Sequence, residues 1–255
     1  MERGRLKREP RQMPLGPMRL ARMIALSSEL SRRAAEAAIA AGRVTVGGEA
    51  ATKQGTTVDP AKDRICLDGR ELRLAARRHY LAFYKPLHVL VTKSDPQCRP
   101  TIWDHLEEWK KGVNSVGRLD FDSEGLILLS DDGDFINRLT HPRHEVWKIY
   151  RVRIKGAPTN EELNRLRSGL KLKDGMTLPA RVKRIDHGDS NALIEIGIRE
   201  GRNRQVRRMF DELGFPVIRL KRTSVGPIVL GRLKPGEWRH LKGEEVNALL
   251  RQSGT

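Results

Sequence analysis

The sequence has few cysteines, few aromatic residues and no long apolar run. Its 255 residues include only two cysteines, Cys66 and Cys98, outside any Cys-x-x-Cys pair, so neither a disulfide framework nor a cysteine-rich zinc site is supported. Aromatic residues make up 5%, too few for a surface that stacks many bases. No segment approaches the roughly 18 apolar residues of a membrane-spanning helix, and no secretory signal is visible. We therefore expect reduced cysteines and a cytoplasmic protein.

Nucleotide-binding and metal-binding fingerprints are also missing from the sequence. There is no P-loop and no GxGxxG motif, and acidic, histidine and cysteine residues form no metal-ligand cluster. His141 and His144 in the HPRH turn could suggest a ligand pair, but turn histidines are more often structural or RNA-facing. We expect no cofactor and no metal.

Positive charge is the strongest compositional signal. The chain has 49 Lys and Arg against 32 Asp and Glu, a formal net charge of +17. Such an excess repels itself in the compact state, and a polyanionic partner is the usual reason that it is tolerated. Nucleic acid is the favoured partner, and a membrane surface is the competing interpretation.

Pattern changes along the chain predict four segments. Residues 1–17 lack apolar periodicity and predict a disordered basic arm, and Met18, directly after this arm, competes with Met1 as the true start. Residues 18–77 predict a small module, residues 78–249 a larger domain and residues 250–255 a tail. Strand-like runs outnumber helical ones in the larger domain and do not alternate strictly with them, which predicts an α+β fold with a mainly antiparallel sheet.

The small module combines two helices with a short sheet. Apolar residues at helical spacing begin at Leu20, and Ser31 can N-cap a second helix that Gly42 ends. The run RVTVGGEAA at residues 43–51 predicts a hairpin, and a further strand begins at Ile65. The basic residues predicted to be exposed are Arg32, Arg33 and Arg43.

The stretch VGRLDFDSEGLILLSDDGD at residues 116–134 places charges directly before a buried strand. Arg118 and Asp120 lie in its turn, where fixed charges cost free energy unless they are paired or used. Three interpretations compete: a solvated loop, an EF-hand-like calcium loop beginning at Asp120, and a catalytic carboxylate with its positioning arginine. The calcium pattern is imperfect, because Asp131 stands where a glutamate is usual and because Leu126–Leu129 reads as a strand.

The stretch IREGRNRQVRRMFDELGFPV at residues 198–217 predicts a helix with arginines crowded at its start. Its apolar face consists of Val206, Met209, Phe210 and Leu213. Arg204, Arg207 and Arg208 fall off that face. Because a helix N-terminus disfavours positive charge, an anionic group must lie nearby, either RNA phosphate or a buried carboxylate. An i,i+4 pair between Arg207 and Asp211 would account for only one arginine.

Four motifs in this order resemble those of the RsuA/RluB family of ribosomal RNA pseudouridine synthases. They are RPTIWDHL (99–106), the GRLD stretch (117–134), WKIYRV (147–152) and EGRNRQVRRMF (200–210). The small module resembles the S-four-type (α-L) RNA-binding domain, on the triplet 31–33, the AGRVTV run 41–46 and the Asp-Gly tail 58–69. The resemblance extends from Met18 to about Leu249.

This resemblance implies a cofactor-free isomerisation of a flipped uridine to pseudouridine in ribosomal RNA. It implies Asp120 as the nucleophile, Tyr150 packed on the uracil as proton acceptor, and Arg207 paired with Asp120. Arg118 would support base flipping. Trp147 departs from the family pattern, which we expect to affect target choice. Large-subunit RNA is preferred over small-subunit RNA, and a monomer is expected. The predicted phosphate contacts are Arg32, Arg33, Arg43, Arg202, Arg204 and Arg208.

Two other functions fit parts of the sequence. A non-catalytic ribosome-assembly factor would use the same basic surfaces, but it would not need Asp120, Tyr150 and Arg207. A hydrolase with Asp120 and Asp122 as paired acids would leave the two basic regions unexplained, and it would release free base.

Overall fold

The computed structural model describes residues 16–53, 55–74, 78–110, 112–186 and 190–252. Contacts divide the chain into two compact units, Met1–Arg78 and His79–Thr255, which we describe separately. The predicted basic arm lies outside the described residues except for positions 16 and 17, and the last three residues of the predicted tail also lie outside them. No described helix has the length and apolar character needed to cross a bilayer.

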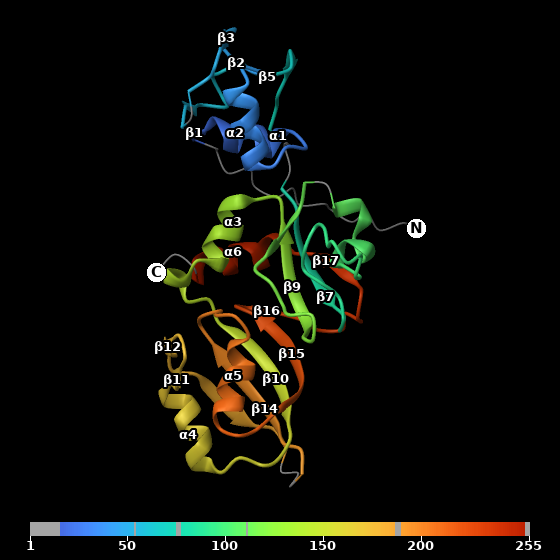
Figure 1. Ribbon diagram of the computed structural model, residues 1–255, viewed down its shortest axis with the longest axis vertical. Coiled ribbons are helices and arrows are strands. Elements are labelled where there is room, and N and C mark those ends of the chain that lie inside the picture. The colour runs from blue at the N-terminus through green and yellow to red at the C-terminus, as the bar shows by residue number, and fades with distance from the viewer. Residues whose placement is uncertain (1–15, 54, 75–77, 111, 187–189, 253–255) are drawn as a thin grey trace, which may run out of the picture. The chain divides into compact units, whose positions relative to one another are not determined.

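The first unit packs two helices against short strands (Figure 1). Ser31 caps the second helix as predicted, because its hydroxyl accepts a hydrogen bond from the Ala34 amide. Leu20, Ile24, Ile39 and Ile65 are among the buried residues of its core. The described elements are β1 (Met18–Arg19), α1 (Leu20–Ser27), α2 (Arg32–Ala40), β2 (Val44–Val46), β3 (Glu49–Ala50), β4 (Thr57–Val58), β5 (Ile65–Leu67) and β6 (Arg70–Glu71).

The predicted hairpin in this unit is confirmed. Strands β2 and β3 pair antiparallel around Gly47 and Gly48. Both glycines have positive φ, 62° and 95°, which is the backbone that a two-residue hairpin turn matched to strand twist requires. Strand β5 adds to the other side of β2, so the order of the small sheet is β3-β2-β5-β6.

The second unit is built on one large sheet. In the described residues the strands of this unit are β7 (Tyr80–Lys85), β8 (Asn114–Val116), β9 (Glu124–Ser130), β10 (Lys148–Ile154), β11 (Lys171–Leu172), β12 (Gly175–Met176), β13 (Arg181–Arg184), β14 (Leu193–Ile198), β15 (Val217–Val225), β16 (Ile228–Val229) and β17 (Trp238–His240). Strands β11 and β12 form a separate two-stranded sheet. The helices of this unit are η1 (Ile102–His105), η2 (Glu107–Trp109), α3 (Gly133–Thr140), η3 (Pro142–His144), α4 (Asn160–Ser168), α5 (Gln205–Glu212) and α6 (Gly243–Gln252).

The main path of the sheet runs β13-β14-β10-β15-β9-β7-β17. Its neighbouring strands are antiparallel except for the parallel pair β9 and β15. The α+β, mainly antiparallel prediction is therefore confirmed. Thr101 and Thr159 each open a helix with a capping box; the first opens a 3-10 helix of four residues and the second a regular α-helix.

Side chains alternate between the two faces of the sheet and build separate apolar cores. Leu126 and Leu128 of β9 pack with Phe135 of α3 and Leu249 of α6, and Figure 1 shows both helices beside that strand. Leu129, on the opposite face, packs with the segment that contains η1. A third core joins β10 and β14 to α4 and α5. The strand ends between these cores are thus held rigidly.

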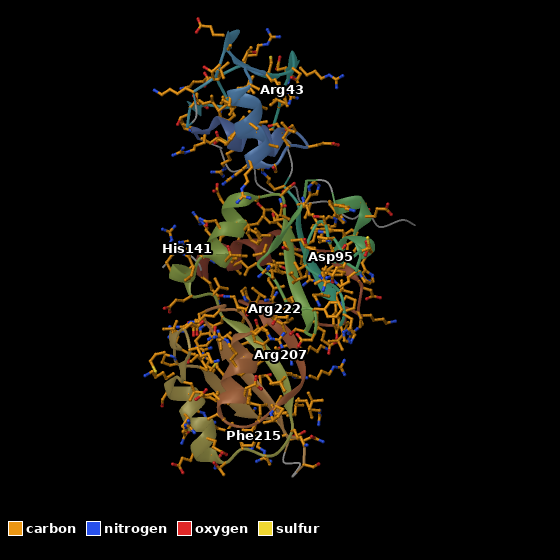
Figure 2. The ribbon with its side chains drawn as sticks, in the orientation of Figure 1. Arg43, Asp95, His141, Arg207, Phe215 and Arg222 are labelled. Carbon is orange, nitrogen blue, oxygen red and sulfur yellow. The ribbon has the colours of Figure 1, made fainter. Side chains whose placement is uncertain are left out.

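One glycine allows the two parallel strands to meet. Gly125 has φ +110°, and a Cβ at this position would lie 2.2 Å from the carbonyl oxygen of Arg222, which is labelled in Figure 2. No other residue fits such a close backbone approach. The contact brings the turn before β9, which carries Asp120, against strand β15.

Candidate active site

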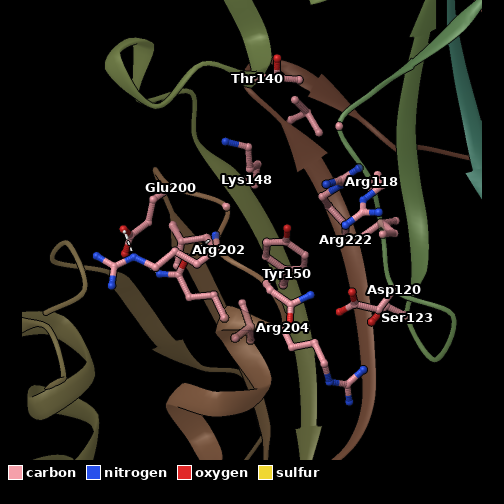
Figure 3. A pocket seen from close by; sticks show the side chains of 18 of the residues that line it. Arg118, Asp120, Ser123, Thr140, Lys148, Tyr150, Glu200, Arg202, Arg204 and Arg222 are labelled. Atoms are coloured by element: carbon pink, nitrogen blue, oxygen red, sulfur yellow. Dashed lines mark hydrogen bonds and ion pairs between the residues drawn. The ribbon is translucent and has the colours of Figure 1, made fainter. Parts of the chain in front are cut away.

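A cavity of about 630 Å³ opens in the second unit beside the Asp120 turn. Its walls come from that turn, from strands β10, β14 and β15, and from the loop that leads into α5. Figure 3 shows Asp120 and Ser123 on one side, Tyr150 at the centre and Glu200 and Arg202 on the other side. The predicted site residues that line it are Arg118, Asp120, Tyr150, Arg202 and Arg204.

Three contacts fix the backbone of the Asp120 turn. The Ser123 amide donates to the Asp120 carbonyl at 3.1 Å, which closes a turn across residues 120–123. The ammonium of Lys85 donates to the Ser123 carbonyl at 2.6 Å, and the His88 amide donates to the Phe121 carbonyl at 2.8 Å. Asp120 is therefore presented from a rigid turn, as precise chemistry requires.

Lys85 is a buried cation that the sequence analysis did not select. Lys85 is 0% exposed, and its ammonium also donates to the Pro86 carbonyl at 2.9 Å. Burial lowers the pKa of Lys85 to about 8, although the nearby carboxylates of Asp120, Asp122 and Glu124 oppose this shift. The signal in the sequence is the position of this lysine at the end of the apolar run YLAFY. The side chain of a residue that continues such a buried strand must itself be buried.

The predicted pairing of Arg207 with Asp120 is wrong. Arg207 bonds to Asp122 instead: its Nε lies 3.2 Å from the carboxylate, and its guanidinium donates to the Asp122 carbonyl at 2.6 Å. It also donates to the Val217 carbonyl at 3.2 Å. No ion pair joins Arg207 to Asp120, both of which are described residues. Arg207 therefore braces the turn from behind and does not line the cavity.

Arg207 also lies on the buried side of its helix, where the apolar pattern alone did not place it. It is 8% exposed, and burial lowers the pKa of its guanidinium. Asp122 receives a second, bidentate contact from Arg204 at 2.9 Å and 2.9 Å. The hydrogen bond from Arg204 is the main reason that the pKa of Asp122 is lowered.

The other arginines of this region also have carboxylate partners within the chain. Arg208 bonds to Asp174 at 2.8 Å and 3.0 Å. Arg202 contacts Glu200 at 3.0 Å and donates to three successive carbonyls of the β11–β12 hairpin. The anionic groups predicted near this helix start are thus carboxylates of the same chain. Arg202 and Arg204 still line the cavity, whereas Arg208 does not.

Three further cations line the cavity, Lys148, Arg199 and Arg222, and none of them was selected from the sequence. Lys148 lies on the same face of β10 as Tyr150, because the two are separated by one residue. Burial and the neighbouring Arg222 lower the pKa of Lys148 to about 8. Arg222 is buried in β15, where its Nε donates to the Leu126 carbonyl at 2.6 Å. Residues two apart in a strand point to the same face of the sheet. The sequence could therefore have placed Arg222 on the same inner face as the apolar Leu220.

Trp147, which departs from the family pattern, lies outside the cavity lining. The guanidinium of Arg181 lies 4.0 Å from the centre of its ring, and that of Arg199 lies 5.2 Å away. Arg199 also bonds to Glu145 at 2.6 Å and lines the cavity. Trp147 therefore contacts a residue of the cavity wall, Arg199, without lining the cavity itself.

The structure also decides between the interpretations of the GRLD stretch. Residues 124–130 form the fully buried strand β9, so they cannot wrap an ion as an EF-hand loop does. Asp122 does not line the cavity, and both of its arginine partners hold its carboxylate. The interpretation as a calcium loop and the interpretation as a hydrolase with two paired acids are therefore both wrong.

The cations predicted in the first unit lie at its surface. Arg32 and Arg33 are exposed at the start of α2, and no ion pair to either is present among the described residues. Arg43 is exposed too, but it forms a bidentate pair with Asp68 at 2.8 Å and 2.5 Å.

Comparison with known proteins identifies the family. Residues 79–212 match the family described as RNA pseudouridylate synthase, and residues 18–65 match the S4 domain. The chain belongs to the RNA pseudouridylate synthase family. It is an isomerase that converts uridine in RNA to pseudouridine, with an S4 domain in its first unit.

Several members of this family are similar to the chain over nearly its whole length. The ribosomal large subunit pseudouridine synthase B of Bacillus subtilis (strain 168) is 38% identical over 91% of this chain and 95% of its own length. An uncharacterized RNA pseudouridine synthase of Aquifex aeolicus (strain VF5) is 35% identical over 93% and 95%. A crystal structure of a pseudouridylate synthase matches with 32% identity and a TM-score of 0.64, over 91% of this chain and 99% of that chain.

Proposed function

We propose that this pseudouridine synthase modifies a uridine of ribosomal RNA, preferably in the large subunit, with Asp120 as its catalytic carboxylate. The name of the Bacillus subtilis relative supports the choice of RNA. The observation that carries the proposal is one cavity that brings Asp120 together with Tyr150 and a set of cationic side chains. We further propose that the chain acts in the cytoplasm as a monomer and without a cofactor.

The size and lining of the cavity suit an extruded nucleotide. Its volume of about 630 Å³ falls in the range of small-molecule sites, about 300–1,000 Å³. Leu119, Ile198 and Leu220 supply apolar wall, and Arg118 and Lys148 supply positive charge. A base leaves its stack at a cost of a few kcal/mol, which an apolar slot for the uracil and cations for its phosphates would offset.

The reaction moves the ribose C1′ bond from uracil N1 to C5. The C1′–N1 bond breaks, the base rotates, a C1′–C5 bond forms, and the C5 proton leaves while N1 is protonated. We assign Asp120 to the carboxylate step and Tyr150, which is buried in the cavity wall, to packing on the uracil and accepting the C5 proton.

Cations around Asp120 would keep it ionised when the nucleotide displaces water. Opposite charge favours the charged form of a carboxyl, and Lys85 is close enough for Asp120 to oppose the lowering of its pKa. Arg222 lines the same cavity on the β15 side (Figure 3). We assign these two residues the supporting role that Arg207 was predicted to have, and we assign Arg207 to positioning of the turn.

Arg118 remains our candidate for base flipping. It is exposed, lines the cavity and lies two residues before Asp120 on the same turn. From there its guanidinium can brace a phosphate or occupy the space that the base leaves. For RNA outside the cavity we propose Arg32 and Arg33 as phosphate contacts. Arg43, Arg208 and the cavity-lining Arg202 and Arg204 already pair with carboxylates of this chain, so each would contact phosphate in addition to its carboxylate or in exchange for it.

The decisive experiment is Asp120→Asn, assayed by tritium release from ribosomal RNA labelled at uridine C5. We expect loss of turnover with little change in RNA affinity, because phosphate contacts do not involve this carboxylate. Asp211→Asn, on the exposed side of α5, is the matched control and should remain active. Undiminished turnover in Asp120→Asn would refute the assignment.

Mapping of carbodiimide stops on ribosomal RNA from a deletion strain identifies the target. A stop that is missing from the strain and restored by the wild-type gene, but not by Asp120→Asn, assigns both the site and the subunit. A pure assembly factor predicts a different result: Asp120→Asn would rescue growth and assembly as well as wild type.

A further inference from the structure

The hydroxyl of Ser123 is buried in the cavity wall and has no hydrogen-bond partner among the described residues. Ser123 is 1% exposed, and its Oγ makes no hydrogen bond to any part of the chain that the structure describes. A buried hydroxyl without a partner costs about 1–3 kcal/mol. Such a group in a native fold requires an explanation, and its place in the cavity lining points to a role in the reaction.

A second buried serine in the same segment provides a comparison. Ser130, the last residue of β9, is 0% exposed. Its hydroxyl donates to the His79 carbonyl at 2.7 Å and accepts from the Asp132 amide at 2.9 Å. Ser130 thus has the complete hydrogen bonding of a structural serine, and Ser123 does not.

The backbone of Ser123 is fixed, but its hydroxyl can turn. The amide of Ser123 bonds to the Asp120 carbonyl, and its own carbonyl accepts from Lys85. Residues at the two ends of such a turn have Cα atoms less than about 7 Å apart, and Figure 3 shows Asp120 and Ser123 side by side on one wall. A change of serine rotamer therefore redirects the hydroxyl without moving the backbone.

We propose that Ser123 is a positioning residue: when the nucleotide fills the cavity, its hydroxyl donates a hydrogen bond to the Asp120 carboxylate. This inference rests on the proposed role of Asp120. Entry of the nucleotide removes water from the carboxylate, and a donor supplied by the protein then keeps the carboxylate charged and oriented. Lys85 contributes charge from the other side of Ser123 but gives its hydrogen bonds to carbonyls.

The test compares Ser123→Ala with Ser130→Ala. Single-turnover tritium release is measured as a function of pH with saturating RNA, and thermal unfolding is measured in parallel. Ser123→Ala removes no hydrogen bond within the protein, so its Tm should equal or exceed that of wild type. Its rate constant should fall about tenfold, as expected for loss of one hydrogen bond to a charged group. The acidic limb of its pH profile should move to higher pH, because Asp120 loses a donor to its charged form.

The control should show the opposite pattern. Ser130→Ala loses two hydrogen bonds, so its Tm should fall while the pH profile of the folded enzyme stays unchanged. Ser123→Thr, which keeps the hydroxyl, should restore the acidic limb. If the acidic limb of the Ser123→Ala pH profile does not shift, the inference is overturned. The same holds if only the affinity for RNA changes. Turnover by Asp120→Asn would instead overturn the proposed function, so the two failures are distinguishable.

Discussion

The arginines of the two units have opposite surroundings. Arg32 and Arg33 in the first unit are exposed, and no ion pair to either is found within the described ranges. Arg202, Arg204 and Arg208 in the second unit each bond to a carboxylate of the same chain. Arginines that crowd around a cavity can thus form its wall, whereas the two exposed arginines at the start of α2 remain available to phosphate.

The difference arises from where the acids are. In the second unit Asp122, Asp174 and Glu200 come from a turn, a hairpin and a loop, and the fold gathers them around the start of α5. In the first unit no carboxylate forms an ion pair with Arg32 or Arg33 in the part of the chain described. Net charge alone therefore overstates the number of cations that can bind RNA.

The largest effect is expected for Asp122→Asn. This change leaves the buried Arg207 without its carboxylate, which typically costs about 3–5 kcal/mol for a fully buried pair. Because the side chain of Asp122 is 38% exposed, we expect a smaller loss, about 2 kcal/mol, in urea unfolding. If arginines 204 and 207 served RNA instead, stability would be unchanged and RNA affinity would rise.

Replacement of both Arg32 and Arg33 by alanine should weaken RNA binding about tenfold without changing the Tm. Each lost phosphate contact on single-stranded RNA lowers the log–log salt slope by about 0.7, so the slope should become shallower by about 1.4. The measurement is a binding titration at several salt concentrations. An unchanged slope would show that these two arginines do not contact phosphate.

Buried lysines should give the second unit a distinctive pH dependence. The pKa of Lys85 and that of Lys148 are lowered from 10.5 to about 8, so between pH 8 and pH 10 the unfolded chain binds more protons than the folded one. The free energy of unfolding should therefore rise with pH in this window, by roughly 1–2 kcal/mol per lysine. Lys85→Met should remove about half of the rise, whereas Lys62→Met at the exposed surface of the first unit should remove none.

The smallest effect is expected for Asp68→Asn, which frees Arg43 from its bidentate pair. Because both side chains are about half exposed, stability should not change measurably. RNA affinity should rise slightly, since Arg43 then resembles Arg32. A fall in affinity would mean that the pair itself orients Arg43 toward RNA.

Local signals predicted the elements of this fold well, because caps and turns depend on neighbouring residues. Ser31 caps its helix, and the Gly47-Gly48 turn forms its hairpin. The position of Asp120 in a turn before a buried strand was also readable. The partner of Arg207 was not, because Asp122 and Asp120 are two residues apart and only the packing of α5 against the turn selects between them.

The sequence by itself determined the family, the mainly antiparallel α+β fold and the turn that carries Asp120, since these follow from motifs and short-range patterns. Only the tertiary structure decided which cations surround that aspartate and which arginines are free. Lys148 and Arg222 reach the cavity from two different strands, Lys85 supports the Asp120 turn from a third, and Arg207 turns inward to Asp122. Such pairings depend on contacts between residues far apart in the chain, which the order of residues does not encode locally.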